Sequence, residues 1–436
     1  MQTYDFKIDF QPIIEVVDTV SIPKMYKVRQ KFKKHSGFNF SEKLREELND
    51  KQELLKAFKG KKVCIAAGSR GINNIADVVR QVVDTVKKYG GQPFIIPAMG
   101  SHGGATAEGQ KSVLKELGIY EENVGAPIIS SMDVEYIGST DEGIPVYTSK
   151  DALNADAVIL INRVKPHTSF RGDIESGLVK MCVIGLGKQK GAEVCHKMGF
   201  YNFAERLKDM ARIIISKVPI LFGVALIEDS YDETVDVRVL KPEEFFTVEP
   251  QLLNKAKSLM PKILIDNLDV LIVDELGKDI SGDGMDPNIT GRFASEYVKG
   301  ELKVNRIVVL RLTDKSEGNA NGIGMADVTT LRVLNQTDFT KGYINSITAA
   351  ITNTVRLPMV MPNDYLAIKT AIKTSNNLDY SGENCRIVRI KNTLKLENIY
   401  ISEALLVEVK NNPQLEVVEG PLDFKFDEAG QLLTGW

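Results

Sequence analysis

Short apolar runs alternate with Gly-rich loops and amphipathic segments from about residue 60 onward. Residues 62–67 (KVCIAA) predict a buried strand, and residues 75–89 predict a helix because their apolar positions recur every three or four residues. Residues 94–97, 107–117 and 157–162 continue the alternation as strand, helix and strand. Strands that alternate with helices are typical of a parallel sheet with helices on both faces.

A second series of the same kind begins after a helical pattern at residues 252–262. Residues 268–274 (LDVLIVD) and 306–312 (RIVVLRL) read as buried strands, each followed by a polar loop. A chain of 436 residues is also too long for one typical core. We therefore expect two α/β domains with mostly parallel sheets flanked by helices and an active-site cleft between them. Residues 1–262 would carry the catalytic and cofactor-anchoring side chains, and residues 263–436 would contribute substrate contacts.

Composition narrows the range of partners. The net charge of −3 is nearly balanced, which argues against nucleic acid or an acidic membrane surface as the main partner. The N-terminus has no signal-peptide pattern, and no window resembles an apolar membrane helix, so we expect a cytoplasmic protein. The four cysteines form no CxxC pair, which favours free thiols in a reducing compartment.

Candidate chemistry follows three successive predicted strands. Ser69 and Arg70 come after the first, His102 after the second within GSHGG (100–104), and His167 after the third within PHTSFRG (166–172). Ligands of open α/β sheets bind beyond the carboxyl ends of the strands. Three neighbouring strand ends that each supply a cationic or titratable group therefore predict a ligand site.

Histidine is scarce in this chain, with four residues in all. His102 and His167 lie in glycine-containing loops, where the backbone can approach a ligand closely. An imidazole titrates near neutral pH and can both take and return a proton. We interpret these two histidines as an acid–base pair, while a purely structural role is the alternative for each of them.

Lys180 stands in an apolar run, SGLVKM (176–181). Burying an amine is unfavourable unless the amine is paired or used chemically, although the stem can also pack while the ammonium reaches water. Lys188 and Lys190 resemble an exposed basic turn, and His196 falls on the next predicted helix as a candidate ligand.

Two further loop types are candidates for binding. The loops GSRGI (68–72) and GSHGGAT (100–106) can cradle phosphate through backbone N–H groups, although neither is a Walker A or GxGxxG motif. In the second half, residues 282–288 and 317–324 are rich in Gly, Asp and Asn but lack EF-hand spacing, so calcium is not expected. Nearby Arg292 is a candidate for bidentate contact with a substrate carboxylate.

Taken together, these motifs resemble the nickel-dependent lactate racemase family of 2-hydroxy-acid racemases and epimerases. The resemblance rests on GSRG (68–71), GSHGG (100–104), PHTSFRG (166–172), SGLVKM (176–181) and His196, sixteen residues after Lys180. It covers the first domain best, and the second domain agrees only in general architecture.

The resemblance implies a nickel-pincer nucleotide, in which nickel is held by a pyridinium dithiocarboxylate-type mononucleotide tethered to a lysine. By position, Lys180 would be the tether, His196 the nickel ligand, and His102 and His167 the proton-transfer pair. The resemblance also implies cofactor-synthesis enzymes as partners during maturation. The remaining implied contacts are Ser69, Gly100 and Ser101 with the cofactor, and Arg70, Arg171 and Arg292 with the substrate.

The implied activity is racemisation or epimerisation of a 2-hydroxy acid, lactate-like or larger, by reversible hydride transfer. Two alternatives remain open at this stage. One is a metal-dependent hydrolase or lyase that gathers the same three histidines around a single zinc or iron ion. The other is a non-catalytic protein that binds an organic anion through its arginines. The sequence also leaves a homo-oligomer open.

Overall fold

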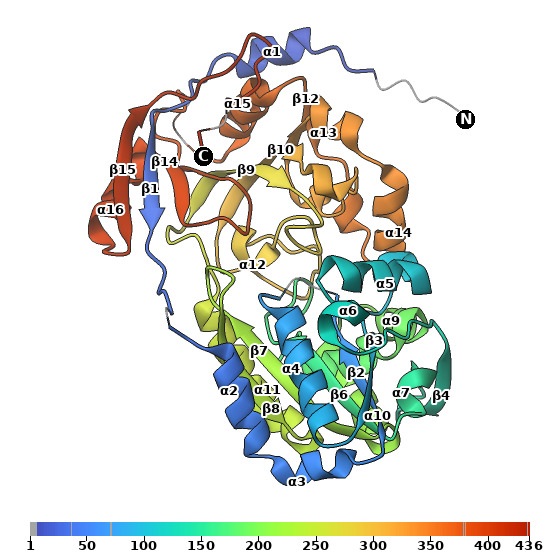
Figure 1. The fold of residues 1–436 in the computed structure, drawn as a ribbon. Helices are drawn as coiled ribbons and strands as arrows, with labels where there is room; N and C mark the ends of the chain where they lie inside the picture. The colour runs from blue at the N-terminus through green and yellow to red at the C-terminus, as the bar shows by residue number, and fades with distance from the viewer. Residues whose placement is uncertain (1–6, 36, 70–71, 378, 380, 434) are drawn as a thin grey trace. The chain divides into compact units, whose positions relative to one another are not determined.

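The computed structural model describes residues 7–35, 37–69, 72–377, 379, 381–433 and 435–436. The chain forms two compact units, one from residues 33–260 and the other from residues up to 32 together with residues 261–436. Each unit has its own sheet flanked by helices (Figure 1). The expected pair of α/β domains is therefore confirmed, whereas the expected cleft between them stays a prediction.

The unit of residues 33–260 is built on a five-stranded sheet in the order β3-β2-β6-β7-β8. β3, β2, β6 and β7 run parallel, and β8 is antiparallel to β7. The predicted strand at residues 62–67 is confirmed residue for residue as β2. The strands of the sheet are β2 (Lys62–Ala67), β3 (Gln92–Pro97), β6 (Ala157–Arg163), β7 (Ile220–Glu228) and β8 (Thr234–Leu240), with a separate hairpin of β4 (Val134–Ser139) and β5 (Pro145–Ser149).

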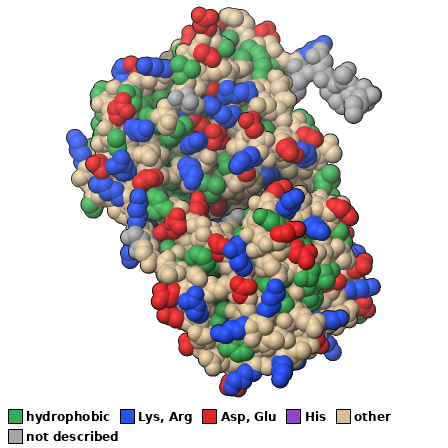
Figure 2. All heavy atoms as spheres, viewed as in Figure 1, with side chains coloured by type: hydrophobic (Ala, Val, Ile, Leu, Met, Phe, Trp, Pro, Cys, Tyr) green, Lys and Arg blue, Asp and Glu red, His purple; other side chains and the backbone are tan. Residues whose placement is uncertain are grey.

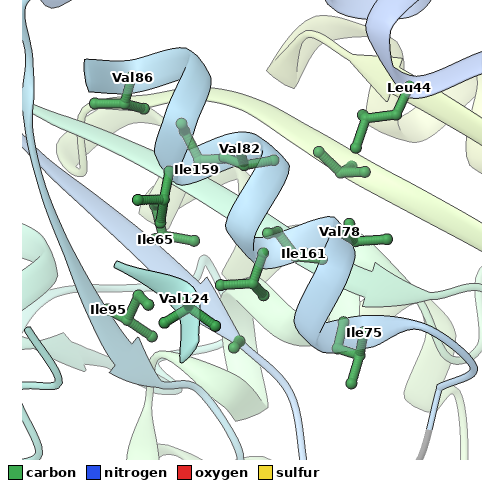
Figure 3. Packing of buried hydrophobic residues seen from close by; sticks show 14 of the residues in the cluster. Leu44, Ile65, Ile75, Val78, Val82, Val86, Ile95, Val124, Ile159 and Ile161 are labelled. Atoms are coloured by element: carbon green, nitrogen blue, oxygen red, sulfur yellow. The ribbon is translucent and has the colours of Figure 1, made fainter. Parts of the chain in front are cut away.

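Helices of this unit follow the strands as the pattern predicts. α4 (Ile75–Lys88) directs its apolar face at the sheet, where its side chains meet Ile65, Ile159 and Ile161 (Figure 3). Each such buried aliphatic side chain contributes about 1.5–3 kcal/mol relative to an exposed one. The other helices are α2 (Phe40–Asn49), α3 (Gln52–Leu55), α5 (Ala107–Glu116), α6 (Glu121–Val124), α7 (Lys150–Leu153), α8 (Leu178–Lys180), α9 (Lys188–His196), α10 (Phe203–Lys217) and α11 (Phe245–Leu259), with a π-helical turn at Met181–Gly185.

The second unit is built on an eight-stranded sheet in the order β12-β11-β10-β9-β13-β14-β1-β15. The strands from β12 to β13 are parallel, and the last three pair antiparallel. Its strands are β1 (Met25–Gln30), β9 (Leu268–Leu276), β10 (Val304–Leu312), β11 (Val328–Thr330), β12 (Met359–Met361), β13 (Ile387–Ile390), β14 (Asn398–Ser402) and β15 (Leu415–Leu422). Its helices are α1 (Gln11–Val17), α12 (Pro287–Thr290), α13 (Leu331–Gln336), α14 (Phe339–Ala349), α15 (Asp364–Thr374) and α16 (Leu406–Asn411).

The N-terminal segment corrects one expectation about the domains. The sequence places residues 1–32 with the first domain, but they belong to the unit of residues 261–436. The reason is that β1 lies between β14 and β15, with Met25 opposite Ser402 on one side and Leu422 on the other. Pairing between segments so far apart along the chain leaves no local signal in the sequence.

The surface agrees with the balanced composition. Acidic and basic side chains are interspersed over the face drawn in Figure 2, without a broad patch of either sign. Among the described residues, no helix is both long and apolar enough to cross a membrane. All four cysteines are buried free thiols.

Candidate active site

Three neighbouring strand ends supply the loops of the candidate site. β3, β2 and β6 are adjacent and parallel, so their carboxyl ends meet at one edge of the five-stranded sheet. Ser69 follows β2, His102 follows β3 and His167 follows β6. Arg70, which the sequence also places here, lies outside the described residues.

His102 contacts Ser69 directly. Nδ1 of the exposed imidazole forms a hydrogen bond with Oγ of Ser69, so the first two strand ends are joined side chain to side chain. The loop below them is held by Gln110 of α5, which is fully buried and donates from Nε2 to the carbonyls of Gly100 (2.8 Å) and His102 (3.3 Å). Ser101, between those carbonyls, is half-buried.

His167 is fixed through both its backbone and its ring. Its backbone N–H donates to Oε2 of Glu175 at 2.7 Å, and the backbone N–H of Ser169 donates to ring Nδ1 at 3.0 Å. Glu175 is 1 % exposed and also pairs with Lys257 (2.7 Å) and Arg171 (3.3 Å). Because Nδ1 accepts a hydrogen bond, the neutral ring carries its proton on Nε2.

Three phenylalanines, Phe170, Phe200 and Phe203, form an apolar wall that His167 and His196 share. Ring centroids of His167 lie 4.5 Å from Phe170 and 6.2 Å from Phe200. Those of His196 lie 5.5 Å from Phe200 and 5.3 Å from Phe203. Phe200 thus touches both imidazoles, and the sequence-predicted His167 and His196 are brought to the same wall.

His196 is the last residue of α9, and its surroundings define its tautomer and its protonation state. Its Nδ1–H donates to the carbonyl of Ala192 at 2.7 Å, so in the neutral ring Nε2 keeps its lone pair. The pKa of His196 is lowered to about 4, mainly by burial and also by the positive charges of Lys180 and Arg206, while the hydrogen bond to Ala192 acts in the opposite direction. The imidazole is therefore neutral at physiological pH, the state that a metal ligand requires.

Lys180 lies close enough to His196 for its charge to affect that histidine's pKa. It ends the short helix α8 and is half-buried. The backbone before it is tied down at two points. Glu249 of α11 accepts the N–H groups of Leu178 (2.7 Å) and Val179 (3.2 Å), and Nδ2 of Asn162 donates to the carbonyl of Gly177 (2.8 Å).

The two described arginines with predicted substrate roles both make internal contacts. Arg171 donates to the carbonyls of His167 (2.7 Å) and Phe170 (3.2 Å), besides its pairing with Glu175. Arg292, in the other unit, pairs with Asp327. It also donates to backbone carbonyls of that unit, those of Met325, Val304 and Asn305. Their substrate roles stay predictions.

The structure adds three polar residues that the sequence did not single out, Gln110, Glu175 and Glu249. It also corrects the interpretation of Lys188, which is fully buried rather than part of an exposed turn. Its Nζ donates to the carbonyl of Pro97 at 2.5 Å, and burial lowers its pKa to about 8. Only Lys190 of the expected basic turn is exposed.

The alternative of a hydrolase or lyase requires three histidines gathered around one metal ion. Within the part of the chain that the structure describes, no group of three or more His, Cys, Asp or Glu side chains is placed to hold a metal ion.

The two sheets define this chain as an α/β protein, and the titratable side chains at the carboxyl ends of adjacent parallel strands make this sheet edge its candidate ligand site. Residues 18–207 match the family model described as the lactate racemase N-terminal domain. The family resemblance of the sequence motifs is thereby confirmed.

The fold agrees with this family. The chain is similar to the lactate racemase apoprotein from Thermoanaerobacterium thermosaccharolyticum, with a TM-score of 0.51 and 14 % sequence identity, over 90 % of this chain and 96 % of that one. At this identity the likeness concerns the fold. A comparison with curated proteins finds no match.

Proposed function

We propose that this protein is an isomerase, a racemase or epimerase of a 2-hydroxy acid that is lactate-like or larger. The observation that carries the proposal is the half-buried, neutral His196, which lies within reach of the charge of Lys180 and beside the wall that His167 also touches. The family of residues 18–207 supports the same reaction class.

The residues fit a nickel-pincer nucleotide. A pincer ligand needs few donors from the protein, and one neutral imidazole with Nε2 unprotonated meets that need. In this proposal His196 holds nickel through Nε2, and the Nδ1–H bond to Ala192 sets the ring's tautomer and orientation. Lys180 tethers the nucleotide, and Ser69, Gly100 and Ser101 line its binding loops.

When bound, this group would supply the hydride chemistry at C2 of the substrate, which is the redox part of racemisation. The side chains of this protein would accept and return the proton of the substrate hydroxyl group. We assign Nε2 of His102 as the acceptor of that proton, with Nδ1–H of His102 donating to Ser69. Nε2–H of His167 is the opposing donor, and the two imidazoles exchange roles for the other enantiomer.

The substrate carboxylate needs cationic contacts, for which Arg70, Arg171 and Arg292 remain the proposed residues. The partners that we propose are the enzymes that make the cofactor, with maturation in the cytoplasm. The wall of phenylalanines beside His167 favours a dry environment for proton transfer.

The test is to produce the chain alongside cofactor-synthesis enzymes and to measure its intact mass, its nickel content and its inversion of single enantiomers of 2-hydroxy acids. We expect added mass at Lys180, none in Lys180→Ala, and loss of nickel in His196→Ala. His102→Ala and His167→Ala should keep the added mass but lose inversion. An unmodified Lys180 without nickel would overturn the proposal.

A further inference from the structure

The segment that leads into Lys180 is held by three separate parts of the unit. Ser176 pairs with Lys165 through two backbone hydrogen bonds of 2.9 and 3.1 Å. Gly177 next accepts the Asn162 amide at 2.8 Å. The chain then turns into α8, and the first two N–H groups of that helix both point at one oxygen, Oε2 of Glu249.

Glu249 reaches this point from α11 and is fully buried. Its other oxygen, Oε1, makes no hydrogen bond with any described residue. A buried carboxyl oxygen without a partner is unfavourable, and burial accordingly raises the pKa of Glu249 to about 7.

Gly177 is shaped to admit that carboxyl group. A Cβ atom at position 177 would lie 2.3 Å from Oε1 of Glu249, closer than any real contact. The carboxyl group thus fills the space over Gly177, three residues before Lys180. It touches the backbone of the Lys180 segment at consecutive positions from 177 to 179.

We propose that Glu249 is the positioning residue of Lys180, because it fixes the backbone segment that carries the amine. The inference rests on the proposed function, in which Lys180 is the cofactor tether, because a tether must present its amine in one direction. It assigns Glu249 no contact with substrate or cofactor. Glu249 acts on Lys180 through its hydrogen bonds with the backbone N–H groups of residues 178 and 179.

The experiment uses the full-length chain without cofactor, so it does not depend on the proposed reaction. Lysine reactivity is measured by trace acetylation with acetic anhydride across a range of pH, followed by mass spectrometry, and amide hydrogen exchange is measured at residues 178–179. Exposed Lys190 is the internal reference for the reactivity of Lys180. Gln251→Ala is the matched control, because Gln251 is exposed on the same helix, α11.

In Glu249→Ala we expect exchange at residues 178–179 to rise about ten- to thirtyfold, as the loss of two hydrogen bonds implies. The ratio of Lys180 to Lys190 acetylation and its pH profile should change as well. Glu249→Gln keeps an acceptor oxygen and should restore both readouts to near wild type. Gln251→Ala should leave them unchanged.

Gly177→Ala provides a second route if Glu249→Ala does not fold. Its Cβ would displace the carboxyl group without removing it, so it should reproduce the altered Lys180 profile, and the double variant should add little. A wild-type Lys180 profile in folded Glu249→Ala or Gly177→Ala would overturn the inference. If the reactivity results are as expected but Lys180 is not modified by the cofactor, the proposed function is overturned and the positioning role of Glu249 is not.

Discussion

The backbone N–H of Ser169 donates to Nδ1 of His167, whereas Nδ1 of His196 is itself the donor, to the carbonyl of Ala192. The two imidazoles beside Phe200 therefore hold opposite tautomers when neutral. His167 carries its proton on Nε2 and His196 carries its proton on Nδ1. One is arranged to give a proton, and the other is arranged to keep a lone pair.

This relationship can be observed without any cofactor. Long-range 1H–15N spectra of the protein labelled at histidine should show a protonated Nε2 in His167 and a protonated Nδ1 in His196 above neutral pH. Single His→Gln variants at 167 and 196 assign the signals. The same tautomer at both positions would contradict the arrangement described above.

Glu175 should support the His167 loop through its charge as well as its hydrogen bonds. Glu175→Ala leaves Lys257, Arg171 and the N–H of His167 without their buried partner. Loss of one partner from a buried ion pair lowers the free energy of unfolding by about 3–5 kcal/mol, and the exposed ends of both cations place the expected loss near the lower figure. Glu175→Gln keeps an acceptor and should lose less. Urea unfolding monitored by circular dichroism measures both variants, and equal stability of Glu175→Ala and wild type would refute this role.

His196 should make the protein less stable in mild acid. Its folded-state pKa of about 4 lies below the usual 6.5, so between these values the unfolded chain binds a proton that the folded chain does not. The free energy of unfolding should therefore fall as the pH decreases from 6.5 toward 4, by up to about 1.4 kcal/mol per pH unit from this group. Urea titrations at several pH values should show a shallower slope in His196→Gln than in wild type.

The loop that carries His102 depends on a close backbone approach at Gly103. A Cβ there would lie 2.5 Å from the backbone of Gly109, and φ is +63°. Gly104 has a similar φ of +64°, but a Cβ there meets nothing within 4 Å. We expect Gly104→Ala to lower the free energy of unfolding by about 1–2 kcal/mol through backbone strain alone. Gly103→Ala should lower it further and shift the NMR signals of His102, and equal effects of the two substitutions would show that the close approach is unimportant.

The sequence predicted the central strands and the main helices well because their signals are local. β2 and α4 are defined by apolar runs and helical periodicity within a few residues of each other. The strand-end placement of His102 and His167 followed from the same local pattern together with a general property of parallel sheets.

The supporting residues could not be predicted in the same way. Glu175 and Glu249 look like ordinary solvated acids in the sequence, and only tertiary packing buries them against backbone N–H groups. The exposed turn that the sequence predicts for Lys188 is wrong for the same reason, since the partner of Lys188, the carbonyl of Pro97, lies at the end of a distant strand. The amino-acid sequence does not show which backbone carbonyl accepts a hydrogen bond from a distant side chain.

The position of β1 has a consequence for synthesis of the chain. Ribosomes make β1 before residues 33–260, yet Arg29 pairs with Asn398 of β14 and Glu416 of β15, which are made after those residues. Residues 33–260 contain all the strands of their own sheet and can complete this sheet while β1 is still unpaired. The nascent chain therefore carries an unpaired strand while residues 33–260 are made, and during that time the strand is exposed to wrong partners and to chaperones. Closure of the second sheet has to follow synthesis of the whole first unit, because it joins segments made before and after that unit.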